Sequence, residues 1–182
     1  DNLRFTAPSE GRPLDQDENT SFDLENSGKE IITLDVRTPE GKGVLDKMLS
    51  NADILLTNWR PQALERHGLD YETLKKKFPK LVMGNVTGYG EKGPDKDLPG
   101  FDYTAFFARG GWSGSLYQKG TVPGNWIPGL GDHQAAMTLA AGVLGAMHRA
   151  RITGQGEHVS VSLLHASIYM QAMLIQASQY GD

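Results

Sequence analysis

Asp132 is the residue whose type and surroundings best suit chemistry. It follows a Pro- and Gly-rich turn, Trp126 to Gly131, and opens a helix expected from about Asp132 to Arg149. The positive end of a helix dipole favours an ionised carboxylate, and a carboxylate on a tight turn can act as a nucleophile. Asp is also a favoured N-cap residue, so capping alone would explain its position. The sequence leaves both roles open, and they are compatible.

Three arginines lie near predicted strand ends, where guanidinium groups that gather together would bind phosphates. They are Arg37, Arg60 and Arg66. Each of them alone is more often a surface residue. Neither G-x-G-x-x-G nor G-x-x-x-x-G-K-[ST] follows a predicted strand, which disfavours an ordinary dinucleotide or nucleoside-triphosphate site.

The histidines and serines show no pattern that points to a catalytic or metal site. The spacing between the histidines and possible carboxylate partners is not that of a metal site; the histidines considered are His133, His148, His158 and His165. Ser160 and Ser162 lie on an apparent strand rather than on the sharp turn of a serine nucleophile. The sequence therefore predicts no metal site and disfavours a serine hydrolase.

The composition is typical of one soluble globular domain with a sizeable core, within 182 residues. A net charge of −4 argues against a nucleic-acid binder, because no basic face dominates. The longest apolar run, Leu139 to Met147, is too short to cross a bilayer, so we expect no membrane partner. The absence of cysteine fits a cytoplasmic location. Because the chain starts at Asp1 without an initiator Met, we expect a processed or excised piece.

The elements that must position these residues begin after a polar stretch. We expect residues 1–29 to form a loop or linker and residues 30–182 to form the folded domain. Alternation of apolar residues predicts a strand from Glu30 to Val36, and Thr38 with Pro39 predicts a helix start. The short apolar run Ile54 to Thr57 predicts a buried parallel strand.

Two short helices and another strand follow in the sequence. One helix is expected to end at Gly68, and the next is capped by Asp70 and stopped by Pro79. A strand is predicted over residues 81–86. Strands that alternate with helices predict an α/β fold with a parallel, Rossmann-like sheet and flanking helices. Ligands of such sheets bind at the carboxyl ends of the strands, here residues 36–37, 57–60 and 86–89.

The second half of the chain begins with a loop over residues 91–100 and a helix over residues 101–108. A long loop over residues 110–129 carries Trp112, Tyr117 and Trp126. Many small residues predict that the helix over residues 132–149 is central and buried. A fourth strand is expected around Val159 and Val161, and a last helix over residues 163–178.

A succession of short segments runs in order from about residue 27 to residue 170. It comprises Ser27–Glu30, Leu34–Gly41, Ala52–Pro61, Leu64–Leu69, Val86–Gly90, Gly93–Pro94, Leu98–Tyr103, Gly131–Arg149, Thr153–Gly156 and His158–Leu164. Their ordered succession resembles the class III CoA-transferases, a family that includes the α-methylacyl-CoA racemases. The resemblance implies the large-domain portion of such an enzyme, with residues 30–182 as a partial Rossmann-like CoA-binding catalytic domain.

The resemblance implies that Asp132 is the catalytic aspartate, which forms a mixed anhydride and then an aspartyl-CoA thioester. A thioester is already activated, so a carboxylate can attack it without a general base. The residues that match the CoA site of the family are Arg37, Asn58, Trp59, Arg66, Thr87, Gly88 and Tyr89. The family often has Phe at the position of Trp59. Some relatives carry Lys at the positions of Arg37 and Thr87, and Thr87 supplies no charge.

The resemblance also bears on the substrates. The expected partners are an acyl-CoA and a small carboxylic acid, of the 2-hydroxyacyl or phenyllactate type, and members of the family form interlocked homodimers. Racemases of the family carry a His where this sequence has Phe101, and phenylalanine cannot exchange a proton, so transfer is favoured over racemisation. An acyl-CoA racemase or epimerase and a non-catalytic acyl-CoA-binding fragment remain the alternatives.

Overall fold

The computed structural model describes residue 3 and residues 19–122, 124 and 127–181. It divides into two units, residues 1–35 and residues 36–182. The first unit contains helix α1 (Thr20–Asn26), within a stretch predicted to be loop or linker. Asn19 caps this helix, because its Oδ1 accepts a hydrogen bond from the Phe22 N–H at 2.9 Å. Residues 1–2 and 4–18 of the predicted N-terminal loop lie outside the described residues.

The strand predicted from Glu30 to Val36 is not formed. Residues 29–35 follow no regular secondary structure, and Ile31 and Ile32 are each 59% exposed. An alternating pattern yields a strand only when a neighbouring strand pairs with its backbone and one face is covered. The described residues supply neither here, so the local signal alone was insufficient.

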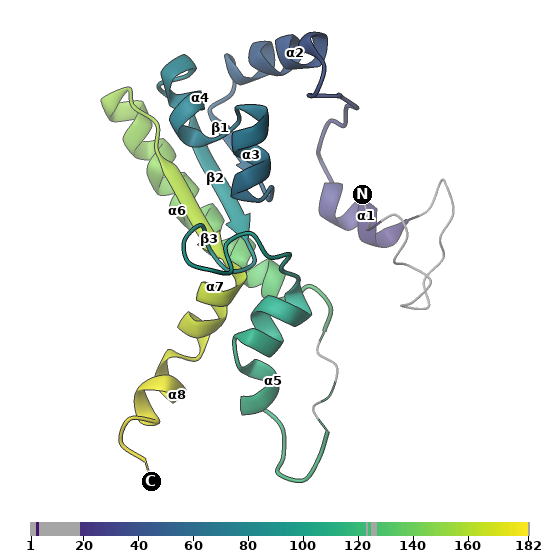
Figure 1. Cartoon of the computed structure of the whole chain (residues 1–182), viewed down its shortest axis with the longest axis vertical. Helices are drawn as coiled ribbons and strands as arrows, with labels where there is room; N and C mark the ends of the chain where they lie inside the picture. Colours follow the sequence, from purple (N-terminus) through teal and green to yellow (C-terminus); the bar gives the residue numbers. More distant parts are fainter. Residues whose placement is uncertain (1–2, 4–18, 123, 125–126, 182) are drawn as a thin grey trace. The chain divides into compact units, whose positions relative to one another are not determined.

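The second unit is built on a parallel sheet of three strands, which confirms the predicted α/β fold (Figure 1). The strands are β1 (Ile54–Thr57), β2 (Val82–Thr87) and β3 (His158–Ser162), in the spatial order β1-β2-β3. Met83 of β2 pairs with Leu55 on one side and with His158 on the other. The predicted strand ends at residues 57–60 and 86–89 are therefore neighbours, because β1 and β2 are adjacent.

Three short helices cover one face of the sheet. They are α2 (Pro39–Leu49), α3 (Pro61–His67) and α4 (Tyr71–Lys77), and their starts and stops follow the predicted signals. The Thr38 and Asp70 side chains cap α2 and α4, and Gly68 ends α3 with a φ of +68°. A buried cluster joins these helices to the sheet through Leu49, Leu64, Leu74, Leu81 and Met83.

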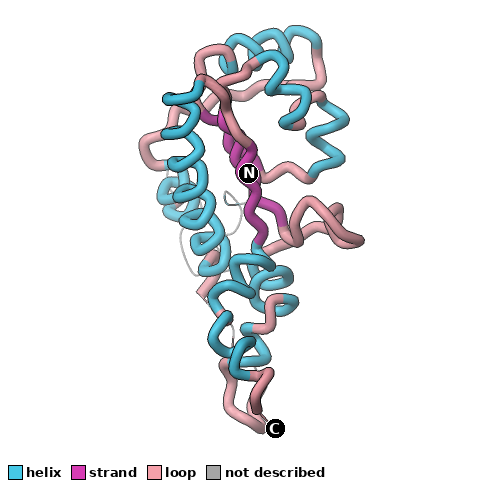
Figure 2. Tube along the Cα trace, turned by 90° about the vertical axis from the view of Figure 1, so that its left-hand side faces the viewer, coloured by secondary structure: helices cyan, strands magenta, loops and turns pink. Residues whose placement is uncertain are grey.

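Helix α6 (Leu130–Thr153) covers the opposite face, as Figure 2 shows from the side. Leu139 and Val143 pack over Gly84 of β2, where a Cβ atom would stand 2.8 Å from Val143 Cγ2. The helix was predicted to be central and buried, and the structure buries one stripe of it, which includes Ala135, Leu139 and Val143. Met137 and Leu144 on the other side of α6 are 70% and 58% exposed. No helix among the described residues combines the length and apolarity that crossing a membrane requires.

The segment predicted as a helix over residues 101–108 winds as a π-helix, η3 (Asp102–Arg109). It packs on α7 (Leu163–Met170), and the buried Ser167 hydroxyl donates a hydrogen bond to the Phe106 carbonyl at 2.8 Å. The side-chain Nε2 of Gln171 donates a hydrogen bond to the Gly110 carbonyl at 2.6 Å. These bonds supply side-chain donors to carbonyl groups at the C-terminal end of η3, where the last carbonyls of a helix lack partners within the helix.

Two further helices depart from the predicted element boundaries. The last predicted helix divides at Gln171 into α7 and α8 (Ala172–Ala177). Helix α5 (Trp112–Ser115) interrupts the loop predicted over residues 110–129, and the predicted Trp126 of that loop lies outside the described residues.

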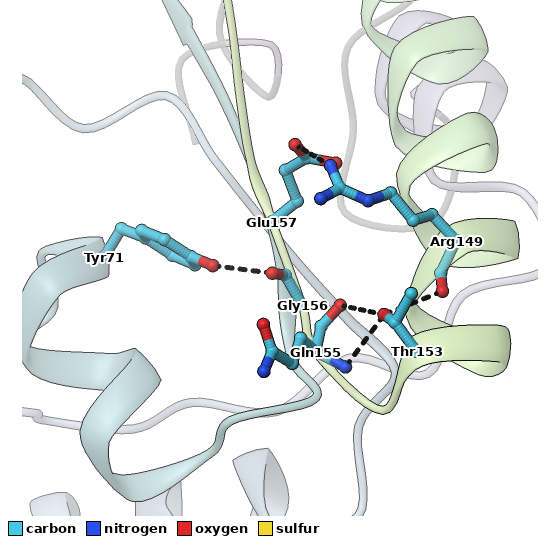
Figure 3. A network of polar contacts seen from close by, with 6 residues as sticks. All are labelled: Tyr71, Arg149, Thr153, Gln155, Gly156 and Glu157. Carbon is cyan, nitrogen blue, oxygen red and sulfur yellow. Dashed lines mark hydrogen bonds and ion pairs between the residues drawn. The ribbon is translucent and has the colours of Figure 1, made fainter.

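A polar network fixes the far end of α6 where the chain turns into β3 (Figure 3). Arg149 Nη1 lies 2.7 Å from Glu157 Oε1, and Thr153 Oγ1 accepts from the Gln155 N–H at 3.2 Å. From the other face of the sheet, the Tyr71 hydroxyl donates to the Gly156 carbonyl at 2.9 Å. The contacts of Arg149 and Thr153 fasten the C-terminal end of α6 to the turn that leads into β3.

Candidate active site

Asp132 lies in the first turn of α6, and its side chain is exposed. The prediction that Asp132 is the N-cap was wrong. Gly129 occupies that position with a φ of +78°, which a residue without Cβ adopts easily, and the helix begins at Leu130. Asp132 therefore stands near the positive end of the helix dipole, an environment that favours its ionised form.

The first turn of α6 lies at the edge of the sheet where the strands end. Leu130 and Ala135 belong to a cluster that includes Val86 and Tyr89 from the carboxyl end of β2 and Val161 from β3. Further along, α6 packs on Val82 at the start of β2 through Ala146 and Ala150, among others. The helix thus runs antiparallel to the strands and presents Asp132 at their carboxyl edge, where ligands of parallel sheets bind.

A second carboxylate, Asp102, lies beneath this turn and was not singled out from the sequence. It is the first residue of η3, it is only 6% exposed, and its Oδ2 accepts a hydrogen bond from the Gly129 N–H at 2.8 Å. Burial raises the pKa of the Asp102 carboxyl above its ordinary value, and the backbone N–H groups of Gly129, Gly131 and Asp132 oppose the rise. The available signal was a carboxylate within the aromatic run from Phe101 to Phe107, since a charge among apolar residues needs a partner.

The end of β1 carries the predicted site residues Asn58 and Trp59, both exposed. The backbone N–H of Trp59 donates to Thr57 Oγ1 at 3.1 Å. The Trp59 ring makes an edge-on contact with the His67 ring, with 5.4 Å between the ring centroids. Arg60 Nη1 donates to the Asp97 carbonyl at 3.0 Å. The strand end is thereby tied both to α3 and to the loop that follows β2.

The end of β2 carries the predicted residues Thr87, Gly88 and Tyr89. Thr87 is buried, and its Oγ1 accepts a hydrogen bond from the Gly90 N–H at 3.0 Å. The Gly88 carbonyl accepts from the Leu164 N–H at 3.0 Å. Tyr89 packs against the cluster that contains Phe106 and Phe107. The side chains of Thr87 and Tyr89 thus shape the turn, and Gly88 brings its backbone to the edge of the sheet.

Arg37 and Arg66, the two arginines of the predicted CoA site, do not lie at the end of a strand. Arg66 is exposed in the last turn of α3, beside the His67 ring that contacts Trp59. Arg37 is exposed in the turn before α2, and it follows no strand because residues 30–35 form none. Of the predicted CoA site, the structure gathers Asn58, Trp59, Thr87, Gly88 and Tyr89 at neighbouring strand ends.

A polar cluster occupies the sheet face that α4 covers. The fully buried Asn85 donates from Nδ2 to Glu91 Oε1 at 3.0 Å, and His158 Nε2 lies 3.3 Å from the same oxygen. The contact with His158, followed by the Asn85 bond, lowers the pKa of Glu91 below its ordinary value. In the described part of the chain, no group of three or more His, Cys, Asp or Glu residues is placed to hold a metal ion.

The whole chain is similar to proteins of one known family. The model of CoA-transferase family III matches residues 1–181. Cinnamoyl-CoA:phenyllactate CoA-transferase of Clostridium sporogenes is 65% identical over 182 residues, which are 100% of this chain and 44% of that protein. (R)-2-hydroxy-4-methylpentanoate CoA-transferase of Clostridioides difficile is 49% identical over 182 residues, 100% of this chain and 46% of that protein.

A solved structure agrees with this assignment. A CAIB/BAIF family protein from Brucella suis superposes with a TM-score of 0.81 at 28% identity, over 89% of this chain and 43% of that chain. The chain therefore spans less than half the length of these relatives. The resemblance seen in the sequence is confirmed, and the chain belongs to CoA-transferase family III.

Proposed function

We propose that the whole protein transfers CoA from an acyl-CoA donor to a carboxylic acid acceptor through a covalent thioester on Asp132. The observation that carries the proposal is the exposed Asp132 carboxylate in the first turn of α6, at the edge where β1 and β2 end. Family membership supports the class of reaction, because the similar proteins are named as CoA-transferases.

The proposed reaction begins when the Asp132 carboxylate attacks the thioester carbonyl of the donor. The C–S bond breaks, CoA leaves as a thiolate, and Asp132 carries a mixed anhydride. The thiolate then attacks the Asp132 carbonyl carbon, which releases the donor acid as a carboxylate and leaves aspartyl-CoA. The acceptor carboxylate repeats the two steps in reverse order, so a new acyl-CoA leaves and the Asp132 carboxylate is restored.

The neighbouring strand ends support a place for CoA beside Asp132. Trp59 is 39% exposed, which leaves ring surface for stacking on a nucleotide base, and the Gly88 backbone lies at the neighbouring strand end. We propose that CoA contacts Asn58, Trp59 and the turn at Thr87, Gly88 and Tyr89. Arg66 and Arg37 are proposed to bind phosphate groups, since both side chains are exposed.

The substrate class is proposed from the relatives. Phenyllactate and 2-hydroxy-4-methylpentanoate, which appear in the names of the two relatives, are both 2-hydroxy acids with a bulky apolar group. We propose that this protein also acts on 2-hydroxy acids or arylacrylic acids as their CoA thioesters. Racemisation is disfavoured because Phe101, 63% exposed at the start of η3, cannot serve as an acid or a base.

The assembly and location are also proposals. A homodimer of the whole protein is supported by exposed apolar side chains on α6 and on the C-terminal helices, including Met137, Tyr169 and Met173 at 70%, 78% and 85% exposure. A molar mass measured by light scattering at several concentrations would test it. The lack of cysteine supports a cytoplasmic protein.

The decisive experiment looks for the covalent intermediate. The full-length protein is incubated with an acyl-CoA such as cinnamoyl-CoA, digested and examined by mass spectrometry. We expect the mass of CoA on the peptide that contains Asp132, and no such adduct in an Asp132→Ala variant. An Asp132→Ala variant that still transfers CoA would exclude the mechanism. Deuterium uptake from solvent at the α-carbon, without an acceptor acid, would instead support a racemase.

A further inference from the structure

The start of α6 takes its capping group from a residue far away in the sequence. Gly129, the N-cap, has no side chain to accept a hydrogen bond from the first turn. Asp102 supplies the carboxylate instead, and its Oδ2 accepts from the Gly129 N–H at 2.8 Å. The turn before Asp132 is therefore fixed by η3, which is itself anchored to α7 through Ser167 and the Phe106 carbonyl.

The carboxylate also fills the space beneath Gly131. A Cβ atom added to Gly131 would overlap Asp102 Oδ1 and the Phe106 ring, and it would stand 2.7 Å from Phe106 Cβ. Gly131 directly precedes Asp132, so the floor under the reacting residue is made by Asp102 and Phe106. The backbone N–H groups of Gly131 and Asp132 also interact with this carboxylate and favour its ionised form.

The two carboxylates differ in a way that separates their roles. Asp132 is exposed and can meet a thioester, whereas Asp102 is 6% exposed and covered by the turn that it holds. A nucleophile needs an open approach to the carbonyl carbon, and a buried acceptor of backbone N–H groups does not have one. Small displacements of a reacting group lower the rate strongly, so a group that fixes this turn affects the chemical step.

We propose that Asp102 is a positioning residue for the chemistry at Asp132. Its buried carboxylate holds the turn from Gly129 to Gly131, so that the Asp132 carboxylate is presented in one orientation at the carboxyl edge of the sheet. The inference rests on the proposed function of Asp132. It predicts that Asp102 governs the rate of the covalent step and has little effect on the affinity for acyl-CoA.

The test compares the full-length wild type with Asp102→Asn, which keeps the size of the side chain and removes its charge. Both are mixed with an acyl-CoA, and the rate at which CoA appears on Asp132 is followed by mass spectrometry, together with kcat and KM. We expect the rate of adduct formation and kcat to fall about 10- to 100-fold, while KM for the acyl-CoA changes less than about threefold.

Two further variants keep the test decisive. Gly131→Ala pushes a methyl group against Asp102 and Phe106 and is expected to lower the same rate, even if Asp102→Asn does not fold. Asp70→Asn is the matched control, because it makes the same change in a carboxylate that caps α4, on the other face of the sheet from Asp132. It is expected to leave the adduct rate within about twofold.

The outcomes separate the two proposals. If the wild type forms the Asp132 adduct and Asp102→Asn forms it at the same rate, the positioning role is overturned while the proposed function stands. An adduct found on Asp102 instead would show that the two roles are reversed. If the wild type transfers CoA with no adduct on Asp132, the proposed function fails, and the positioning role fails with it.

Discussion

The backbones of Gly88 and Gly100 cross so closely that a Cβ atom on Gly88 would stand 2.5 Å from the Gly100 Cα. A Cβ on Gly100 would likewise overlap Gly88. The crossing ties the turn after β2 to the residue two positions before Asp102 in the chain. It therefore links the proposed CoA-binding turn to the carboxylate that holds the start of α6.

Replacing either glycine by alanine is expected to force this crossing apart. Forcing extra carbon atoms into a packed site costs about 1–3 kcal/mol, and here the obstacle is backbone, which yields less than a side chain. We expect Gly100→Ala in the full-length protein to lower the free energy of unfolding by at least about 2 kcal/mol in urea denaturation. Gly43→Ala is the matched control, because a Cβ there meets nothing within 4 Å in the middle of α2. It should be neutral or stabilising by about 0.5–1 kcal/mol.

Trp59 is expected to contribute to CoA affinity through its exposed ring. Aromatic pairs contribute about 0.5–1.5 kcal/mol beyond burial, so Trp59→Ala should raise KM for acyl-CoA roughly 2- to 10-fold. Trp59→Phe keeps an aromatic face and should stay within about threefold of the wild type. Steady-state kinetics with varied acyl-CoA measures both. Equal KM values for wild type and Trp59→Ala would remove Trp59 from the site.

Ser167, which lies on α7, is expected to stabilise η3 through its hydrogen bond to the Phe106 carbonyl. Its removal in Ser167→Ala leaves the buried Phe106 carbonyl without the bond of 2.8 Å, and an unsatisfied buried group costs about 1–3 kcal/mol. The exposed Ser178, which donates to the Ile175 carbonyl at 2.8 Å, provides the control Ser178→Ala. Thermal unfolding should show a clear drop for the first variant and almost none for the second. Equal melting temperatures would mean that η3 does not depend on Ser167.

The pair of Glu91 and His158 should make stability depend on pH. Since the pKa of Glu91 lies below its ordinary value of 4.5 in the folded protein, the ionised group stabilises the fold above that value. This contribution disappears as the pH falls through the lower folded value. Glu91→Gln should therefore be less stable than the wild type at pH 7 and converge towards it as the pH falls below 4.5 and through the lower folded pKa. Urea midpoints across that range test it, and Glu65→Gln, an exposed carboxyl on α3, is the control. Parallel curves for wild type and Glu91→Gln would contradict the assignment.

Short-range signals in the sequence predicted much of the fold correctly. Thr38, Gly68 and Asp70 end or begin helices where expected, because caps and left-handed turns depend on a few consecutive residues. The helix start near Asp132 was predicted within a few residues, although Gly129 and not Asp132 is the N-cap. The parallel sheet followed from the alternation of strands and helices.

Features that depend on distant residues escaped prediction. The segment from Glu30 to Val36 has the composition of a strand but no pairing partner among the described residues. The π-helix η3 is bonded at its C-terminal end by Ser167 and Gln171, which lie far along the chain. Asp102 was missed for the same reason, since its contact with Gly129 exists only once η3 and α6 have come together.

The pairing of β2 with β3 has a consequence for the order in which the chain can fold. Met83 finds its partner His158 only after η3, α5 and α6 have been synthesised. A central strand that waits for a distant neighbour folds slowly and exposes unpaired backbone in the meantime. Shortened chains that stop before β3 should therefore aggregate, and the capacity to form the candidate site should arise late, when the end of β3 is in place.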